Sequence, residues 1–101
     1  MLLMCMLDTI HAKRDEIHAI AKKHKAERLW VFGSVARKEE RPDSDVDFLV
    51  EFGKGASLRN WSGFHLGMED LFGRKVDVIC SGALDREPYF AHAVRKDMLP
   101  V

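Results

Sequence analysis

The chain has 101 residues and is 47% hydrophobic, which is enough for one domain with a buried core and too little for a second, substrate-binding domain. Its sixteen Lys and Arg residues balance sixteen Asp and Glu residues, so it lacks the basic excess of a typical nucleic-acid binder. We therefore expect a single domain over residues 1–101, with no direct nucleic-acid partner and with any polyphosphate site confined to a local cluster.

The cysteines and the apolar first residues indicate the cellular compartment. Cys5 and Cys80 lie far apart and outside any metal-ligand spacing, which favours free thiols in a reducing cytoplasm over a disulfide framework. The opening MLLMCML is too short to span a bilayer, and it lacks the basic region and cleavage site of a signal peptide. We expect a cytoplasmic protein with no membrane partner.

The first predicted element is an amphipathic helix from Leu7 to about Lys25, because its apolar residues recur near a 3.6-residue period. A short strand rich in large apolar side chains follows at 28–32, and Gly33 ends it. Residues 34–39 favour a short helix. Pro42, Asp43 and Ser44 then supply the chemistry of a turn.

The second predicted strand, residues 45–52, has a regular alternation. Successive side chains of a strand point to opposite faces, so Val46, Phe48, Val50 and Phe52 share one face. That face is apolar and predicts the core side. Asp45, Asp47, Leu49 and Glu51 share the other face, which we expect to be the uncovered side of a sheet with helices on one side only.

A second amphipathic helix is predicted at 58–72, with Gly73 as its C-terminal cap. Gly63 and Gly67 inside it each cost about 1 kcal/mol relative to Ala, which predicts a close approach by another element.

A third strand is predicted at 75–80. Its side chains alternate between the two faces, and Asp77 falls on the uncovered one. Pro88 suits the first position of a final short helix. The predicted class is therefore α/β: a two-layer fold with a small mixed sheet, helices on one face and three aspartates on the open face.

Three carboxylates on one face favour a divalent-cation site. Asp45 and Asp47, two residues apart on a strand, lie about 6.6 to 7 Å apart and point the same way, so they can bracket such ions. Like charges held close together repel, whereas Mg²⁺ prefers oxygen ligands and completes its shell with substrate phosphates. Asp77 would complete a two-metal site for in-line displacement at phosphorus.

Gly33 and Ser34 supply the second half of the candidate site. A glycine at a strand-to-helix turn lets a phosphate approach the backbone, and the first N–H groups of the following helix favour an anion. Ser34 adds a hydroxyl donor. Arg37 shares a helix face with Ser34, so its guanidinium could hold terminal phosphates.

Each feature taken alone also has a simpler interpretation. A Gly-Ser pair after a strand is commonly only a turn, Asp-x-Asp pairs are frequent on surfaces, and Arg37 lies among other charges on a short helix. The five histidines show no metal-ligand spacing and are expected to be ordinary surface or boundary residues: His11, His18, His24, His65 and His92. The combination and its spacing favour the catalytic interpretation.

The segment GSVARKEERPDSDVD resembles the GS-x10-DxD signature of the polymerase-beta-type nucleotidyltransferases, and most resembles their minimal MNT members, which are often paired with HEPN-domain toxins. The resemblance extends from the leading helix through RKVDVI to Pro100 and Val101. It implies that Gly33 and Ser34 hold a triphosphate with help from Arg37. It also implies that the three aspartates bind two Mg²⁺, with Asp77 orienting the attacking hydroxyl. Lys38 departs from the pattern, because such proteins commonly carry Gly there.

The resemblance implies transfer of a nucleoside monophosphate, AMP from ATP, to a tyrosine of a partner HEPN toxin, in a homo-oligomer or a hetero-oligomer with that toxin. Two alternatives stay open. One is a non-catalytic antitoxin that neutralises its partner by stoichiometric binding. The other is a metal-dependent glycosyltransferase that uses Asp-x-Asp, although that chemistry normally needs a larger nucleotide-binding fold.

Overall fold

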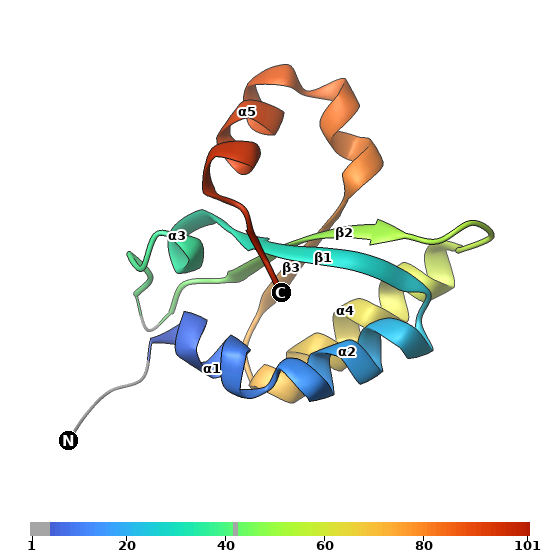
Figure 1. The fold of residues 1–101 in the computed structure, drawn as a ribbon, viewed down its shortest axis with the longest axis horizontal. Helices are drawn as coiled ribbons and strands as arrows, with labels where there is room; N and C mark the ends of the chain where they lie inside the picture. Colours follow the sequence, from blue (N-terminus) through green and yellow to red (C-terminus); the bar gives the residue numbers. More distant parts are fainter. Residues whose placement is uncertain (1–4, 42) are drawn as a thin grey trace.

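The computed structural model describes residues 5–41 and 43–101 of the chain (Figure 1). The elements follow in the order α1 (Met6–Ala12), α2 (Arg14–Lys23), β1 (Ala26–Phe32), α3 (Gly33–Ala36), β2 (Val46–Phe52), α4 (Leu58–Phe72), β3 (Val76–Cys80), the 3₁₀ helix η1 (Ser81–Arg86), α5 (Pro88–Asp97) and β4 (Leu99–Pro100). Residues 1–4 of the apolar opening and Pro42 of the predicted turn lie outside the described residues.

Four strands form one mixed sheet in the order β3, β2, β1, β4. β1 runs antiparallel to β2, with Phe32 opposite Asp47, whereas β2 and β3 are parallel, with Asp47 opposite Asp77. A parallel pair needs a long crossover connection, and α4 supplies it. β4 pairs with β1 only at Trp30 and Val31. The predicted α/β class with a small mixed sheet is confirmed.

The main apolar core lies between one face of the sheet and α1, α2 and α4 (Figure 1). Val46, Phe48 and Val50 are fully buried there, as their alternation in the sequence predicts. Phe64 and Met68 meet them from α4 and have no exposed surface. The sheet and its first helical layer thus form as the apolar periodicity of each segment indicates.

The two glycines inside α4 allow α2 to approach closely. A Cβ atom at Gly63 would lie 2.6 Å from the ring of His24, and one at Gly67 would lie 3.0 Å from Cγ2 of Ile20. The close approach predicted at these positions is confirmed, and its source is α2. α4 ends at Gly73, which adopts the left-handed conformation with a φ of 63°.

The second face of the sheet is covered in part by η1 and α5 (Figure 1). Leu49, which shares the strand face of Asp47, is only 2% exposed. It belongs to a small apolar cluster with Phe32, Leu84, Ala91 and Val94. The helices of the main layer do lie on one face, as predicted. The expectation of a bare second face is wrong around Leu49, whereas exposed side chains remain on this face at Asp77 and at Arg28, which is paired with Glu51.

Some boundaries differ from the prediction. The expected helix from Leu7 to about Lys25 is divided at Lys13, whose backbone (φ −102°, ψ 15°) separates α1 from α2. Residues 37–39 lie beyond α3. β4 and η1 were not predicted, because a two-residue strand and a short 3₁₀ turn carry no hydrophobic period. Cys5 and Cys80 are both free. Within 5–41 and 43–101, no helix combines the length and the apolar character needed to cross a membrane.

Candidate active site

Asp47 and Asp77 lie side by side on neighbouring parallel strands. They are register partners near the starts of β2 and β3, so both side chains emerge on the second face of the sheet. Asp47 is half-buried, and Asp77 is exposed. Their carboxyl groups come within hydrogen-bond reach of each other. The structure therefore brings together the two carboxylates that the alternation of the sequence places on one face.

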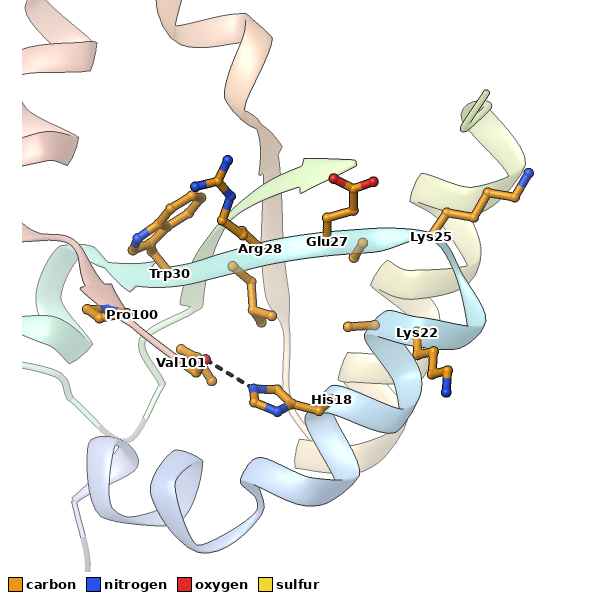
Figure 2. A pocket seen from close by; sticks show the side chains of 11 residues that line it. His18, Lys22, Lys25, Glu27, Arg28, Trp30, Pro100 and Val101 are labelled. Carbon is orange, nitrogen blue, oxygen red and sulfur yellow. Dashed lines mark hydrogen bonds between the residues drawn. The ribbon is translucent and has the colours of Figure 1, made fainter. Parts of the chain in front are cut away.

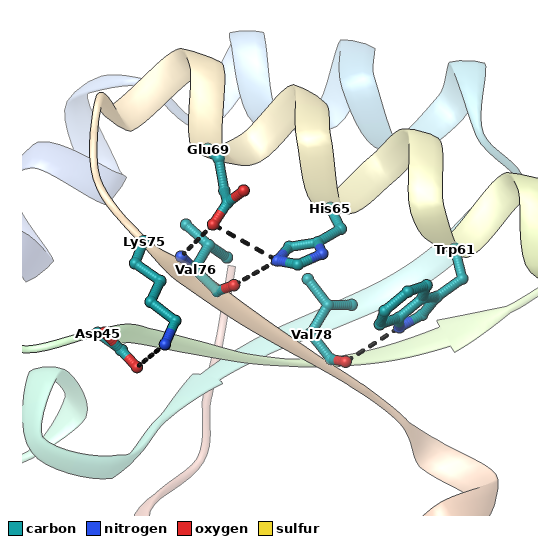
Figure 3. A network of polar contacts seen from close by, with 7 residues as sticks. All are labelled: Asp45, Trp61, His65, Glu69, Lys75, Val76 and Val78. Atoms are coloured by element: carbon teal, nitrogen blue, oxygen red, sulfur yellow. Dashed lines mark hydrogen bonds and ion pairs between the residues drawn. The ribbon is translucent and has the colours of Figure 1, made fainter.

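Side chains of α4 are hydrogen-bonded to the β3 backbone at Val76 and Val78, the two neighbours of Asp77 in the chain (Figure 3). The backbone N–H of Val76 donates to Oε2 of Glu69 at 3.1 Å, and Nε2 of His65 donates to the Val76 carbonyl at 2.5 Å. The indole N–H of Trp61 donates to the Val78 carbonyl at 3.0 Å. These contacts satisfy the outer edge of β3 without another strand. Sequence reasoning missed them, because helix–strand hydrogen bonds leave no periodic signal.

Asp45 precedes β2 and turns toward a lysine. Its Oδ2 lies 3.8 Å from Nζ of Lys75, and its side chain is 35% exposed (Figure 3). Asp45 is still close enough to Asp47 to act on it electrostatically. In the protein alone, Lys75 therefore offsets part of the negative charge that the three aspartates concentrate at this end of the sheet.

The pKa of Asp47 is raised from 3.8 to about 6. Burial is the largest cause, the charge and hydrogen bond of Asp77 come next, and Asp45 adds to the shift. Arg37 opposes it. A carboxyl group that resists ionisation between two other carboxylates indicates a site in which negative charge is crowded together and a cation would bind favourably.

Gly33 makes room for the carboxylate of Asp47. A Cβ atom at Gly33 would lie 2.4 Å from Oδ2 of Asp47, and the φ of Gly33 is +74°, a region that side chains disfavour. Ser34 follows in the first turn of α3, and its carbonyl accepts the backbone N–H of Glu39 at 2.8 Å. The Gly-Ser turn after β1 and Asp47 of β2 therefore lie side by side.

Arg37 is exposed, and its guanidinium is held by two carboxylates. Its Nη1 donates to Oδ2 of Asp97 at 2.5 Å, and its Nε donates to Oε2 of Glu39 at 3.2 Å. These two hydrogen bonds raise the pKa of the guanidinium above its usual value. Asp97 is 15% exposed at the end of α5, 60 residues from Arg37, so no local motif could have indicated this pair.

Lys38 has a φ of 59° and is one of two described non-glycine residues with a positive φ, the other being Lys25. A glycine would adopt this conformation without a steric penalty. The position at which the chain departs from the resembling family is therefore a position where the backbone favours Gly. The departure alters the conformational cost of the turn and removes none of the candidate ligands.

The donor chemistry at this end of the sheet suits a hard cation such as Mg²⁺, because all three candidate ligands are carboxylates. Asp47 and Asp77 are register partners on β2 and β3, and Asp45 lies just before β2. Within residues 5–41 and 43–101, no three acidic, His or Cys side chains are already gathered around one point that could hold an ion. The ion pair between Asp45 and Lys75 accounts for part of this difference. Asp45 would have to turn from Lys75 to join the other two carboxylates.

Two hollows in the described part of the chain lie away from these aspartates. One, of about 510 Å³, runs between α2, β1 and β4 (Figure 2). The other, of about 490 Å³, lies beyond the far ends of β2 and β3, beside Phe52 and Cys80. Neither of these two hollows includes Asp45, Asp47 or Asp77 in its lining.

Comparisons with known proteins identify the family of the chain. Residues 15–98 match the family model described as Polymerase beta, Nucleotidyltransferase. The protein adenylyltransferase MntA of Thermococcus cleftensis is 36% identical over 78 residues, covering 69% of this chain and 79% of that protein. A solved structure provisionally described as a minimal nucleotidyltransferase is 37% identical, with a TM-score of 0.81, and the match covers 94% of this chain and 95% of that one.

A more distant solved structure shares the fold alone. It is described as the tri-AMPylated HEPN toxin of Shewanella oneidensis in complex with MNT antitoxin. The matched chain is 12% identical, with a TM-score of 0.64, and the match covers 89% of this chain and 69% of that one.

Proposed function

The chain belongs to the polymerase beta nucleotidyltransferase family, and from this membership we propose that it transfers AMP from ATP to a hydroxyl group of a partner protein. The observation that carries the proposal is the contact of Asp47 with Asp77 on one side and with Gly33 on the other. This contact joins a candidate phosphate turn to a pair of carboxylates. The nucleotide donor, the acceptor and the metal ion are each part of this proposal.

We assign Asp45, Asp47 and Asp77 as the groups that would hold two Mg²⁺ ions, which supply charge neutralisation at the attacking and leaving oxygens. The Gly33 backbone and the Ser34 hydroxyl would hold the triphosphate. The acceptor oxygen attacks the α-phosphorus, and the bond from that phosphorus to the bridging oxygen breaks. Pyrophosphate leaves with that oxygen. We propose that Asp77, the exposed carboxylate of the pair, takes the hydroxyl proton.

Arg37 would bind the terminal phosphates from the edge of α3. Its charge already acts on Asp47, so the guanidinium lies within electrostatic range of the carboxylates. Asp97 and Glu39 hold it in the protein alone. A triphosphate carries more negative charge than either carboxylate, so we expect it to compete for at least one face of the guanidinium.

For the acceptor we propose a tyrosine of a HEPN-domain toxin. The two hollows of about 500 Å³ lie away from the aspartates, so neither would hold a small acceptor next to them. The acceptor is therefore expected to arrive on a protein surface. The fold shared with the antitoxin chain of the Shewanella oneidensis complex, which contains a tri-AMPylated HEPN toxin, supports this choice.

The test uses ATP labelled at either the α- or the γ-phosphate, with Mg²⁺ and the partner protein. We expect the α label to appear on the partner and the γ label to leave with pyrophosphate. Asp45→Asn/Asp47→Asn should abolish transfer, whereas Asp70→Asn, on the exposed side of α4, should retain it. Transfer by the double variant at the parent rate would refute the assigned site.

Stoichiometric neutralisation without catalysis is the second candidate, and one observation favours it. Asp45 and Arg37 are both occupied by ion pairs with other residues, Lys75 and Asp97. If binding alone neutralises the partner, the Asp45→Asn/Asp47→Asn variant should protect cells from the toxin as well as the parent does. Loss of protection together with loss of transfer would favour the catalytic function.

A further inference from the structure

The outer edge of β1 is only partly paired. β4 pairs with Trp30 and Val31, and the backbone N–H of Val101 donates to the Leu29 carbonyl at 3.1 Å. Among the described residues, no strand lies beside 26–28 on this side of β1. The first half of β1 therefore presents a sheet edge on which an additional strand could continue the pairing that β4 begins.

A groove runs along this open edge, with a volume of about 510 Å³ (Figure 2). Its floor is apolar. Ala21, Ala26 and Leu29 line it, and each of them is less than 9% exposed. Val101 lies across one end, and its carbonyl is hydrogen-bonded to the ring of His18 at 3.1 Å. The groove therefore combines a strand edge with space for small apolar side chains.

The rim of the groove is cationic. Lys22, Lys25 and Arg28 line it, against a single carboxylate, Glu27. That carboxylate packs over the turn after β2, where a Cβ atom at Gly53 would lie 2.5 Å from Glu27 Oε1. Arg28 is paired with Glu51 at 3.0 Å. In the described part of the chain, Lys22 and Lys25 form no ion pair, so their charges are available to a ligand.

We propose that this groove binds an extended, acidic segment of a partner protein, which adds to the sheet as a strand antiparallel to β1. β4 already shows that an antiparallel segment fits the same edge. Residues 26–28 leave room for about three residues of the added strand at about 3.3 Å per residue. Its main chain would pair with the edge, its apolar side chains would face Ala26 and Leu29, and its carboxylates would meet the cationic rim.

The strand edge favours a peptide over a nucleic acid. Unpaired backbone N–H and C=O groups are satisfied by another main chain in the extended conformation, whereas RNA binding relies on phosphate contacts and exposed stacking surfaces. The whole chain also has no net basic excess. The proposal does not depend on the nucleotide chemistry at Asp47, which lies on a different part of the sheet.

The test uses the full chain, labelled with ¹⁵N, and a blocked peptide of sequence Asp-Val-Glu-Val-Asp. We expect amide shifts and slowed hydrogen exchange at 26–29. Two matched peptides serve as controls: Lys-Val-Lys-Val-Lys reverses the charge, and a form N-methylated at alternate residues keeps the charge but cannot complete the strand pairing. Neither should bind comparably.

On the protein side, Lys22→Glu/Lys25→Glu should weaken peptide binding by about tenfold, because each reversed surface charge contributes a fraction of a kcal/mol. Arg95→Glu/Lys96→Glu makes the same change in net charge on the exposed side of α5, away from the groove, and should leave binding unchanged. Equal binding of the N-methylated or the basic peptide would overturn the proposal. So would tighter binding of a short RNA at 26–29, or peptide-independent shifts there that grow with protein concentration and indicate a second copy.

Discussion

The carboxylate of Asp47 lies in the space that a side chain on Gly33 would fill, since a Cβ atom there would be 2.4 Å from Oδ2 of Asp47. The contact links the turn after β1 to the start of β2. The two strands meet here, because Phe32 at the end of β1 is the register partner of Asp47 in β2. A single glycine therefore determines how closely the candidate phosphate turn approaches the candidate metal ligand.

Replacing Gly33 with Ala should lower stability and abolish transfer together. The positive φ costs about 1 kcal/mol for a side-chain-bearing residue, and the collision with Asp47 adds to it. Gly55→Ala is the matched control, because Gly55 has a φ of +84° and nothing within 4 Å of its Cβ position. Urea unfolding measures both variants. Equal losses of stability would contradict the contact.

The pKa of Asp47 gives a pH dependence of defined sign in the metal-free protein. Its folded pKa of about 6 exceeds the ordinary value of 3.8, so between these values the folded state binds more protons than the unfolded state. Stability should therefore fall as pH rises from about 4 to about 6 and stay level above. Asp47→Asn removes this dependence. We expect that variant to be about 1 kcal/mol more stable than the parent at pH 8, a value reduced for solvent screening of a half-exposed carboxyl.

Chemical denaturation at several pH values, in the presence of a chelator, measures the Asp47 effect. Asp70→Asn provides the control on an exposed carboxylate. Parallel pH profiles for the parent and Asp47→Asn would show that Asp47 ionises normally, and would remove the electrostatic argument for a cation at this position.

Gly63→Ala should destabilise the protein although Ala is the better helix former. The new Cβ would lie 2.6 Å from the His24 ring, so α2 and α4 must separate, at a cost of about 1 to 3 kcal/mol. Adding His24→Ala removes the obstructing ring and should restore much of the loss. Free energies of unfolding for the parent, both single variants and the double variant form a double-mutant cycle. Additive effects would show that the two residues do not touch.

Lys38→Gly should raise the free energy of unfolding by about 0.5 to 1 kcal/mol, because Lys38 has a φ of 59° that glycine adopts without a steric penalty. Lys54→Gly is the control, since Lys54 is exposed and has no positive φ. Thermal unfolding measures both. Transfer should persist in Lys38→Gly, because Lys38 is not a candidate ligand. A loss of stability equal to that of Lys54→Gly would contradict the strain at Lys38.

Local sequence patterns predicted most of the sheet and the shared face of Asp47 and Asp77. The alternation in 45–52 placed Val46 and Phe48 in the core, and the matching parity of Asp77 predicted its position beside Asp47. Gly63 signalled the close approach of a neighbour but could not identify it as His24. Long-range pairs such as Arg37 and Asp97 had no sequence signal, because they depend on how α5 folds back over the sheet.

The intact mass of a HEPN-domain toxin co-expressed with this protein tests the proposed transfer. With the parent chain, we predict a toxin mass increased by one or more adenylyl groups, with the modification on tyrosine. With Asp45→Asn/Asp47→Asn, the mass should be unchanged, and with Asp70→Asn it should match the parent. A toxin that forms a stable complex with the parent chain but keeps its unmodified mass would contradict catalysis and support neutralisation by binding alone.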